Sequence, residues 1–408
     1  MNVFDTLKSR GYIYQTSNDE GIKKLLSKPT TIYQGFDPSA DSFHAGQIIY
    51  LTAFHHLLKA GHQIVFLLGG GTGLVGDPTG KDKARPLMSK EKIEANVRAL
   101  EKQAKDLLGS ESEILFLNNA DWLTKIGLLE FLRETAGHIS VNQLLTHETY
   151  RDRLANQQNL SLLEFLYSSL QAWDFLYLFE EHNCRLQIGG QDQWRNILDG
   201  VELVRKIKQE EVFALTSPLL TIGRKKMGKS EKGAVWLDPE KISPYEFYQY
   251  WVNTLDKDLE RNLKLFTLLD LKKIARIMKG HPREIQHRLA FEVTKFIHGQ
   301  ETAEQAKKAS EKLFSSEQEV ADTQEVPTEK ITQTDLIKNL TIVEILVNSK
   351  LASSKSAARR LIQQDGVKLN NEKITNVEKS ITERNFNTQG VATLQVGKRR
   401  KVVIKYAD

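Results

Sequence analysis

Three polar side chains lie at helical spacing in a segment, residues 161–181, that is otherwise apolar. The segment carries Leu and Phe nearly all round, which is typical of a buried helix. Tyr167, Gln171 and Asp174 follow one another at intervals of four and three residues, so they form one polar stripe on this helix. Buried polar groups need partners, and a buried carboxylate needs them most. The stripe therefore meets another polar core element or lines a ligand cavity, and we favour the cavity because it combines phenol, amide and carboxylate.

A second group of residues, 33–47, could bind a nucleotide. It joins a predicted strand to a predicted helix that begins near Gly46, where free backbone N–H groups and the positive end of the helix dipole attract an anion. His44 and Gln47 are three residues apart and face the same way on the first turn. Both could reach a triphosphate or a ribose. A hydrated loop with a capping residue explains the same pattern equally well.

A third group, residues 223–230, is strongly basic. Arg224, Lys225, Lys226 and Lys229 place four cations within six residues, and glycines stand at 223 and 228. Such a loop can close over a polyphosphate and neutralise charge that develops in a transition state. Taken alone, the pattern is more often a solvated basic turn.

Residues 71–76 match the dinucleotide fingerprint G-x-G-x-x-G, so a nicotinamide oxidoreductase is a competing interpretation. That fingerprint needs a helix that begins inside the motif. Here Gly76 leads into Asp77-Pro78-Thr79-Gly80, a turn sequence that breaks a helix. The phosphate-loop pattern also fails, because Gly80-Lys81 is followed by an aspartate. We expect these glycines to let the backbone pass close to a ligand or to a neighbouring strand.

The elements that must position these residues alternate in the first half of the chain. Strand patterns cover residues 31–36, 64–68, 113–117 and 185–188, and helical patterns cover 46–60 and 161–181. This alternation predicts a parallel sheet covered by helices on both faces. After about residue 241 the strand patterns fade, and five helices are predicted over 244–253, 258–268, 271–279, 282–299 and 302–314.

Composition narrows the class of protein. With 408 residues the chain predicts two or three domains, and 40% hydrophobic with 27% charged residues is a globular composition. The single cysteine, Cys184, excludes internal disulfides and a multi-cysteine zinc site. Apolar runs are too short to span a bilayer, and the first residues lack the order of a signal peptide. We therefore expect a cytoplasmic protein without a membrane partner.

The charge is concentrated near the C-terminus. Residues 341–408 hold thirteen Lys and Arg against six Asp and Glu, whereas the whole chain has a net charge of only +5. A predicted helix over 351–362 carries Lys355, Arg359 and Arg360, and a later basic turn carries Lys398, Arg399 and Arg400. A basic appendage of this kind favours nucleic acid as the partner. The preceding acidic, polar stretch, 315–334, is typical of a linker.

Two of these segments, His44-Ala45-Gly46-Gln47 and Lys226-Met227-Gly228-Lys229-Ser230, resemble the HIGH and KMSKS signatures of class I aminoacyl-tRNA synthetases. Residues 33–38, 76–80, 170–175 and 187–194 are in addition similar to segments of the bacterial tyrosyl-tRNA synthetases, and the similarity extends over essentially the whole chain. The C-terminal segment resembles an S4-type RNA-binding module. The resemblance implies an α/β fold with a Rossmann-like parallel-sheet catalytic domain, then an all-α domain and a small α+β S4-like domain. The boundaries that we expect are 1–225 for the catalytic domain, 226–314 for the signature loop and helical tRNA-contacting domain, 315–336 for a flexible acidic linker and 337–408 for the S4-like domain.

Carried over residue by residue, the resemblance also implies four groups of site residues. Residues expected to bind L-tyrosine are Tyr33 and Asp174 at the phenolic hydroxyl, Asp77, Tyr167 and Gln171 at the ammonium group, and Gln193 near the carboxylate. Residues expected to bind ATP are Gly35, Asp37, Ser39, His44, Gly46, Gln47, Gly190, Asp192 and Lys229. Residues expected to act in catalysis around the phosphates are His44, Gln47, Lys81, Arg85, Lys226, Lys229 and Ser230. Residues expected to bind RNA are Lys355, Arg359, Arg360, Lys398, Arg399 and Arg400.

The expected partners are L-tyrosine, ATP with Mg²⁺, tRNA(Tyr) and a second copy of the chain, with no tightly bound cofactor and no protein-held metal. The chain departs from the family pattern at Gln47, where histidine is usual, at Gln34, where cysteine is frequent, and at Trp173 and Arg195. A glutamine can bond a ribose oxygen but cannot carry charge. An RNA-binding paralogue with weakened catalysis is therefore one alternative. A tryptophan-activating relative is another, although Tyr33 and Asp174 suit a hydroxyl better than an indole.

Overall fold

The computed structural model describes residues 2–79, 88–109, 113–222, 225–226, 229–230, 233–315, 328–387, 390–397 and 400–406, with side chains for all of these except 221–233 and 312–315. The chain forms two compact units. The first comprises residues 1–229, 234–238 and 260–276, and the second comprises 230–233, 239–259 and 277–408. None of the described helices has the length and apolar character needed to cross a bilayer.

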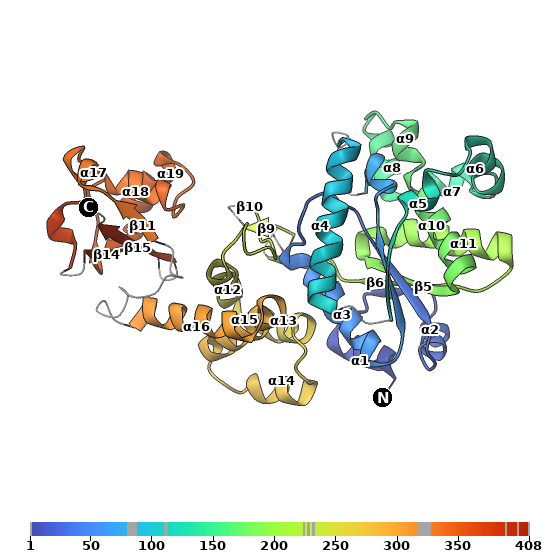
Figure 1. Cartoon of the computed structure of the whole chain (residues 1–408), viewed down its shortest axis with the longest axis horizontal. Coiled ribbons are helices and arrows are strands. Elements are labelled where there is room, and N and C mark those ends of the chain that lie inside the picture. The colour runs from blue at the N-terminus through green and yellow to red at the C-terminus, as the bar shows by residue number, and fades with distance from the viewer. Residues whose placement is uncertain are drawn as a thin grey trace. The chain divides into compact units, whose positions relative to one another are not determined.

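A six-stranded sheet forms the centre of the first unit (Figure 1). Its strands stand in the order β1 (Gln15–Thr16), β6 (Phe213–Ser217), β5 (Cys184–Gly190), β2 (Thr31–Phe36), β3 (Gln63–Leu68) and β4 (Ile114–Asn118). Strands β2 to β6 pair in parallel, and only the short edge strand β1 is antiparallel. The predicted parallel sheet is therefore confirmed. Its two central strands, β2 and β5, are adjacent in the sheet although they are far apart in the sequence.

Helices pack on both faces of this sheet, as the alternating pattern predicted. Tyr33, Val65 and Leu67 point to one face, where they meet α10 (Tyr167–His182) and α11 (Trp194–Lys208) in one apolar core. Phe36 and Phe66 point to the other face, where their rings stack at 4.3 Å and contact Phe54 of α3 (Ile48–Lys59). Because side chains alternate along a strand, adjacent residues of β2 face different layers. Tyr33 and Gln34 are one such pair.

The remaining helices within residues 1–165 are shorter than α10 or were not predicted. They are α1 (Val3–Arg10), α2 (Asp19–Leu25), α4 (Lys90–Leu108), α5 (Ala120–Leu123), α6 (Leu128–Glu134), α7 (Val141–Leu144), α8 (Glu148–Ala155) and α9 (Leu162–Phe165). The single helix predicted over 161–181 is wrong in one respect, because it is divided at Leu166 into α9 and α10. Ser161 and Glu164 form a capping box that begins α9 as a separate turn.

The region after residue 241 is helical, as predicted. Its helices are α12 (Pro244–Val252), α13 (Leu259–Phe266), α14 (Leu271–Ile277), α15 (Pro282–His298) and α16 (Gln300–Ser315). Proline stands at the first turn of both α12 and α15, where its missing N–H and fixed φ favour a helix start. Short strands precede them: β7 (Thr221–Ile222) pairs with β8 (Lys225–Lys226), and β9 (Lys229–Ser230) and β10 (Gly233–Ala234) follow.

The C-terminal part has its own sheet and core. Its strands stand in the order β11 (Thr328–Ile331), β15 (Arg400–Tyr406), β14 (Val391–Val396), β12 (Val367–Leu369) and β13 (Glu372–Lys373), and its helices are α17 (Gln333–Ile337), α18 (Ile342–Asn348) and α19 (Lys355–Gln363). The linker expected over 315–336 is too long, because β11 pairs in parallel with β15 and buries Ile331. The sequence pattern did not predict this strand because the residues around Ile331 are polar.

Candidate active site

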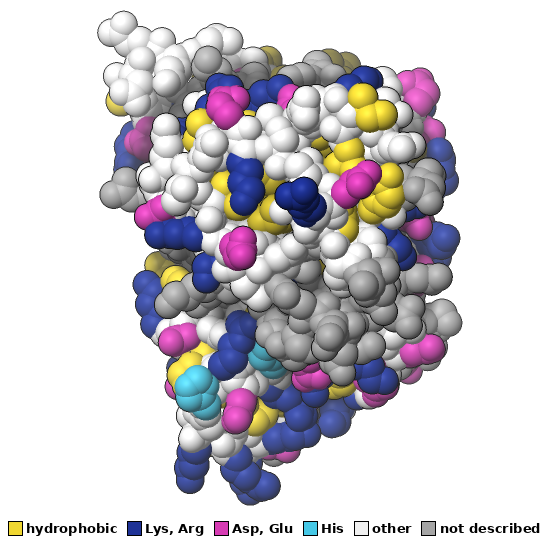
Figure 2. All heavy atoms as spheres, turned by 90° about the vertical axis from the view of Figure 1, so that its left-hand side faces the viewer, with side chains coloured by type: hydrophobic (Ala, Val, Ile, Leu, Met, Phe, Trp, Pro, Cys, Tyr) yellow, Lys and Arg dark blue, Asp and Glu magenta, His cyan; other side chains and the backbone are white. Residues whose placement is uncertain are grey.

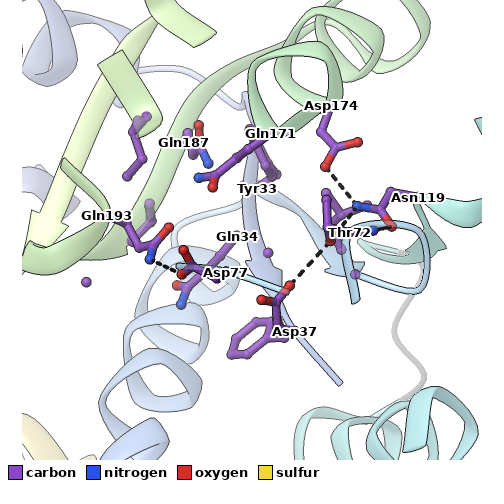
Figure 3. A pocket seen from close by; sticks show the side chains of 18 of the residues that line it. Tyr33, Gln34, Asp37, Thr72, Asp77, Asn119, Gln171, Asp174, Gln187 and Gln193 are labelled. Atoms are coloured by element: carbon purple, nitrogen blue, oxygen red, sulfur yellow. Dashed lines mark hydrogen bonds between the residues drawn. The ribbon is translucent and has the colours of Figure 1, made fainter. Parts of the chain in front are cut away.

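A cavity of about 230 Å³ opens in the first unit beside the carboxyl ends of β2, β3 and β5 (Figure 3). This is where ligands bind in open α/β sheets, since the strand order reverses there. The polar residues that line it are Tyr33, Gln34, Asp37, Ser39, Gln47, Tyr50, Thr72, Asp77, Asn119, Tyr167, Gln171, Asp174, Gln187, Asp192 and Gln193. The polar stripe of α10 thus faces a cavity, as the sequence predicted.

Asp174 is a buried carboxylate, 2% exposed, with two donors from outside its own helix. Nε1 of Trp122 donates to Oδ1 at 2.8 Å, and Nδ2 of Asn119 donates to Oδ2 at 2.9 Å. Burial raises the pKa of Asp174 to about 7, although these two hydrogen bonds oppose the rise. The carboxylate is therefore held in one orientation while its charge remains poorly solvated.

Tyr33 lines the same cavity, and its side chain is 1% exposed. Its hydroxyl has no hydrogen-bond partner among the residues that the structure describes. Burial, followed by the charge of Asp174, raises the pKa of Tyr33, which keeps the hydroxyl protonated and able to donate. The ring packs edge-on against Phe175 with centroids 5.1 Å apart, so it cannot turn away freely. A buried, unpaired hydroxyl beside a buried carboxylate is a site that a ligand hydroxyl can complete.

The other end of the cavity holds two further carboxylates in a hydrogen-bond network. Oη of Tyr167 lies 3.1 and 3.2 Å from the two carboxylate oxygens of Asp37. Nε2 of Gln193 donates to Asp77 at 2.8 Å. Nδ2 of Asn196 lies 3.3 Å from the side-chain oxygens of both Gln193 and Gln171. Two carboxylates with oriented acceptors around them favour a ligand cation such as an ammonium group.

The helix start near Gly46 is capped, as the capping interpretation predicts. Nδ1 of His44 accepts from the backbone N–H of Gly46 at 3.1 Å, and Oε1 of Gln47 accepts from the N–H of His44 at 3.0 Å. These bonds form a capping box on the turn Ala45–Gln47 that precedes α3. Gln47 also lines the cavity, whereas His44 and Gly46 are not among its lining residues.

The segment that follows the basic loop returns to this helix start. His44 and Trp236 form an isolated antiparallel bridge. The N–H of Ala45 donates to the carbonyl of Val235 at 2.7 Å, and the N–H of Leu237 donates to that of Phe43 at 2.8 Å. Residues 235–237, which follow the basic loop in the sequence, therefore lie beside the first signature segment, although nearly two hundred residues separate the two in the sequence.

Charge is unevenly distributed in the site. Asp37, Asp77, Asp174 and Asp192 line the cavity, and the described lining residues include no Lys, Arg or His. Lys81, Arg85, Lys398 and Arg399 lie outside the described residues, and the side chains of Lys226, Lys229 and Ser230 do as well. Within the described part of the chain, no cluster of three or more His, Cys, Asp or Glu could hold a metal ion.

The glycine segment 71–76 does not begin an α-helix. It contains one 3-10 turn, Thr72–Leu74, and its N-terminal end is held by Asn119, whose Oδ1 accepts from the N–H of Gly71 at 2.7 Å. At Gly69 a Cβ atom would lie only 2.7 Å from Oδ1 of Asp37, so glycine permits a close approach there. The segment is therefore part of the cavity wall, and it lacks the geometry of a dinucleotide fingerprint.

Several residues of the site were not singled out from the sequence. Trp122 and Asn119 come from a segment, 118–123, in which no motif was recognised. Asn196 could have been found, since it lies three residues after Gln193 on the first turn of α11 and shares its face. Gln187 could also have been found, since it alternates along β5 with apolar residues; its Oε1 is buried without a partner among the described residues.

Four of the expected RNA-binding residues lie among the described residues of the C-terminal part: Lys355, Arg359 and Arg360 on α19, and Arg400 on β15. Lys355, Arg359 and Arg360 are exposed on α19, which Ser354 caps. Nζ of Lys355 lies 2.8 Å from Glu344, and this hydrogen bond, before all other causes, lowers the pKa of Glu344 to about 2. Arg400 donates to the carbonyl of Leu351 at 3.0 Å, so it joins β15 to the segment before α19. Figure 2, in which the left-hand side of Figure 1 faces the viewer, shows Lys and Arg side chains interspersed with Asp and Glu.

Known proteins share this organisation. A family model described as class I tRNA synthetases (W and Y) matches residues 25–315, and one for the C-terminal domain of SYY-like tyrosine–tRNA ligases matches 318–404. A tyrosine–tRNA ligase of Clostridium botulinum is 46% identical over 396 residues, which cover 96% of each chain. One of Acetivibrio thermocellus is 43% identical over 404 residues, 98% of each chain.

A solved structure matches as well. The C-terminally truncated mitochondrial tyrosyl-tRNA synthetase of Aspergillus nidulans is 31% identical with a TM-score of 0.71, over 77% of this chain and 94% of that one. The dinucleotide interpretation of residues 71–76 is thus set aside on two grounds, its geometry and its relatives. Matches to both family models and to nearly full-length relatives mean that the chain belongs to the tyrosyl-tRNA synthetase family of class I aminoacyl-tRNA synthetases.

Proposed function

We propose that this protein activates L-tyrosine with ATP, forming tyrosyl-adenylate and pyrophosphate, and then transfers tyrosine to the 3′ end of tRNA(Tyr). It is an aminoacyl-tRNA ligase by family. The observation that carries the choice of tyrosine is the unpaired hydroxyl of Tyr33, which faces the same cavity as the buried carboxylate of Asp174. The phenolic hydroxyl of the substrate would donate to Asp174 and accept from Tyr33.

This arrangement excludes phenylalanine for a physical reason. Without the substrate hydroxyl, Tyr33 keeps an unpaired donor and Asp174 keeps a buried charge with one acceptor direction unused. A site built to bond a hydroxyl rejects the analogue that lacks it more strongly than an apolar pocket rejects a missing methylene. Tryptophan offers an N–H but no acceptor, so Tyr33 would remain unpaired with that substrate too.

The ammonium group of the substrate would lie at the opposite end. Asp77, Tyr167 and Gln171 are the residues that we assign to it, and Asp37 supports them because it accepts from Tyr167. Gln193 would lie near the substrate carboxylate, held by its bond to Asp77. Fixing both ends of the amino acid would orient the carboxylate toward the nucleotide.

The first reaction needs no nucleophile from the protein. A carboxylate oxygen of tyrosine would attack the α-phosphorus of ATP in line, forming the mixed anhydride while the bond between the α-phosphorus and the bridging oxygen breaks and pyrophosphate leaves. Since the described lining of the cavity is acidic, we assign the cations around the phosphates to Lys81, Arg85, Lys226 and Lys229. His44, Gln47 and Ser230 would add hydrogen bonds to the same groups. Mg²⁺ bound through the phosphates would neutralise part of their charge, and a cage of protein ligands is not required.

The remaining ATP-binding residues would hold the nucleoside. Gly35, Gly46, Gly190 and Asp192 are assigned to the adenosine, and Ser39 with His44 to the phosphates. Gly35, Ser39, Gly190 and Asp192 line the cavity, which supports their assignment, and the bridge between His44 and Trp236 supports a place for the basic loop beside the phosphates.

Two partners belong to the proposal. Transfer RNA would contact the helical region 226–314 and the C-terminal domain through Lys355, Arg359, Arg360, Lys398, Arg399 and Arg400, in a cytoplasmic protein. A second copy of the chain would cover apolar side chains that are exposed on the short helices between β4 and β5. They are Leu128, Leu129, Leu132, Val141, Leu145, Leu154, Leu162 and Leu163, with Leu129 80% exposed. Exposed apolar side chains in this density favour a protein interface.

The test is amino-acid-dependent ATP–pyrophosphate exchange, run with Mg²⁺ and each of the twenty amino acids. Exchange with tyrosine alone, abolished in Asp174→Ala and retained in Asp121→Ala at an exposed aspartate of α5, supports the proposal. Exchange with tryptophan instead would contradict the substrate. A folded protein that binds tRNA but exchanges with no amino acid would favour the RNA-binding paralogue, which Gln47 in place of histidine motivates.

A second measurement separates the two steps of the reaction. Arg359→Glu with Arg360→Glu should reduce aminoacylation of tRNA and leave exchange unchanged, because exchange involves no RNA. Weaker tRNA binding should be accompanied by a smaller dependence of binding on salt. If aminoacylation is unaffected by this charge reversal, the RNA-binding assignment of α19 is wrong.

A further inference from the structure

The segment between β2 and the turn at Ala45, residues 37–44, forms no helix or strand apart from the single bridge at His44. Asp37 and Ser39 line the cavity, and His44 begins the capped turn. An irregular segment makes few backbone hydrogen bonds of its own, so its buried N–H and C=O groups need partners from elsewhere. Two side chains of α4, the long helix labelled in Figure 1, provide such partners.

Asn96 holds the start of this segment. Its Nδ2 donates to the carbonyl of Pro38 at 2.8 Å, and the whole side chain of Asn96 is buried. Its Oδ1 has no partner among the described residues, so this amide acts there as a donor. A Cβ atom on Gly73 would lie 3.2 Å from Cγ of Pro38 and 3.5 Å from Cγ2 of Ile93. Pro38 is therefore packed together with the loop after β3 and with α4.

Gln103 holds the end of the segment. It follows Asn96 by seven residues, so the two amides share one face of α4. Its Oε1 accepts from the N–H of Phe43 at 2.8 Å and lies 3.3 Å from Oγ of Ser42. Phe43 is fully buried, and its ring packs edge-on against Phe36 of β2 with centroids 5.6 Å apart. The N–H of Phe43 is thus shielded from water and depends on Gln103.

Each of these two backbone bonds lies one residue before a group that we assign to the ATP phosphates. Pro38 precedes Ser39, and Phe43 precedes His44. Anchors at both ends therefore fix the backbone that carries these groups. Because activation depends on in-line placement of the phosphates, displacing such groups by about 1 Å can slow a reaction by about 100-fold.

We propose that Asn96 and Gln103 are positioning residues for the reaction, and that they fix segment 37–44 from its two ends without contacting the nucleotide. Neither residue is among those that line the cavity. The inference rests on the proposed function, since Ser39 and His44 matter here as ligands of the ATP phosphates. It gives α4 a role in catalysis that acts through the backbone of another segment.

The two amides use opposite ends, and this difference is the basis of the first test. A carbonyl only accepts and an N–H only donates, so Asn96 presents its amino group to Pro38 and Gln103 presents its oxygen to Phe43. Gln103→Glu keeps an acceptor, whereas Asn96→Asp replaces the donor by a second acceptor. In ATP–pyrophosphate exchange, kcat should stay within about threefold in Gln103→Glu and fall about 10- to 100-fold in Asn96→Asp. Equal effects of the two acids would overturn the inference.

Gln103→Ala separates positioning from folding stability. The side chain is only half-buried, so this variant should unfold at nearly the same temperature as the parent. Its kcat should fall about 10- to 100-fold, whereas the KM for tyrosine should stay within about twofold, because Phe43 lies at the far end of the segment from Asp37. Lys102→Ala, at an exposed neighbour on α4, is the matched control and should keep the parent's kcat. A parental kcat in Gln103→Ala would contradict the proposal.

Hydrogen–deuterium exchange gives a readout that needs no activity. The amide of Phe43 should be protected in the parent and in Gln103→Glu, and should exchange at least about tenfold faster in Gln103→Ala. Unchanged protection in Gln103→Ala would mean that Gln103 does not anchor the segment. If the parent forms no adenylate with any amino acid, the proposed function fails, and this measurement still decides whether α4 fixes residues 37–44.

Discussion

Asn119 joins the buried carboxylate of Asp174 to the glycine segment: its Nδ2 lies 2.9 Å from Oδ2 of Asp174, and its Oδ1 lies 2.7 Å from the N–H of Gly71. The side-chain amide of Asn119 thus donates to a residue of α10 and accepts from the backbone of the loop after β3. Because both bonds are buried, moving the loop would displace the carboxylate or leave it with a single donor. The end of the cavity that holds Asp174, to which we assign tyrosine, is therefore positioned by a residue outside both signature segments.

The pH dependence of tyrosine recognition should report Asp174. Burial raises its pKa to about 7, and the ionised form is the one that can accept the substrate hydroxyl. The kcat/KM for tyrosine should therefore fall as the pH is lowered through about 7, approaching about tenfold per unit. The measurement is a pH profile of ATP–pyrophosphate exchange with limiting tyrosine.

Asn119→Ala should shift that profile. Removing one donor to the carboxylate raises the pKa of Asp174 further, so the midpoint should move to higher pH and the KM for tyrosine should increase. Asn118→Ala is the matched control, since Oδ1 of Asn118 accepts from the N–H of Ala120 and Asn118 is not among the described hydrogen-bond partners of Asp174. An unshifted midpoint in Asn119→Ala would mean that another group governs the profile.

Tyr33→Phe should relax the choice between tyrosine and phenylalanine. The variant removes the donor to the substrate hydroxyl but keeps the ring against Phe175. The kcat/KM for tyrosine should drop about tenfold while that for phenylalanine changes little, because phenylalanine never used this oxygen. Parallel exchange assays with the two amino acids measure the ratio. If the ratio of kcat/KM for tyrosine to that for phenylalanine equals that of the parent, Tyr33 does not contribute to the recognition of the hydroxyl.

Arg153→Ala should destabilise the first unit. Nη1 of Arg153 lies 2.6 Å from Oε1 of Glu164, and both side chains are almost fully buried. Removing the cation leaves a buried carboxylate unpaired, which costs about 3–5 kcal/mol. Thermal unfolding followed by circular dichroism should show a midpoint lower by several degrees. Arg151→Ala is the control, because the pair that Arg151 forms with Asp152 is exposed and contributes little.

Leu129→Asp should give a monomer. Leu129 is 80% exposed on α6, among the leucines that we propose a second copy covers, and a buried charge there would oppose association. Sedimentation equilibrium should report a dimer for the parent and a monomer for this variant. Leu255→Asp, at a partly exposed leucine before α13, should remain dimeric. A parent that sediments as a monomer would contradict the interface itself.

Local patterns were sufficient for several elements of the fold. The strand predicted over 31–36 is β2, and the five helices predicted after residue 241 are α12 to α16 with small changes at their ends. The stripe of Tyr167, Gln171 and Asp174 was readable because residues three and four apart share one face of a helix, whatever surrounds it. Periodicity and turn chemistry are properties of a single segment, so one sequence suffices to detect them.

The partners of those residues were decided only by the tertiary structure. Trp122 and Asn119 donate to Asp174 from more than fifty residues away, and the carboxylate would be isolated without them. The bridge of His44 to Trp236 and the bond of Gln103 to Phe43 likewise depend on which element lies beside which. Such contacts follow from the packing of complete layers, and no pattern within one segment records them. The sequence by itself determined which chemical groups the site holds, and the order of strands in the sheet decided which of those groups meet.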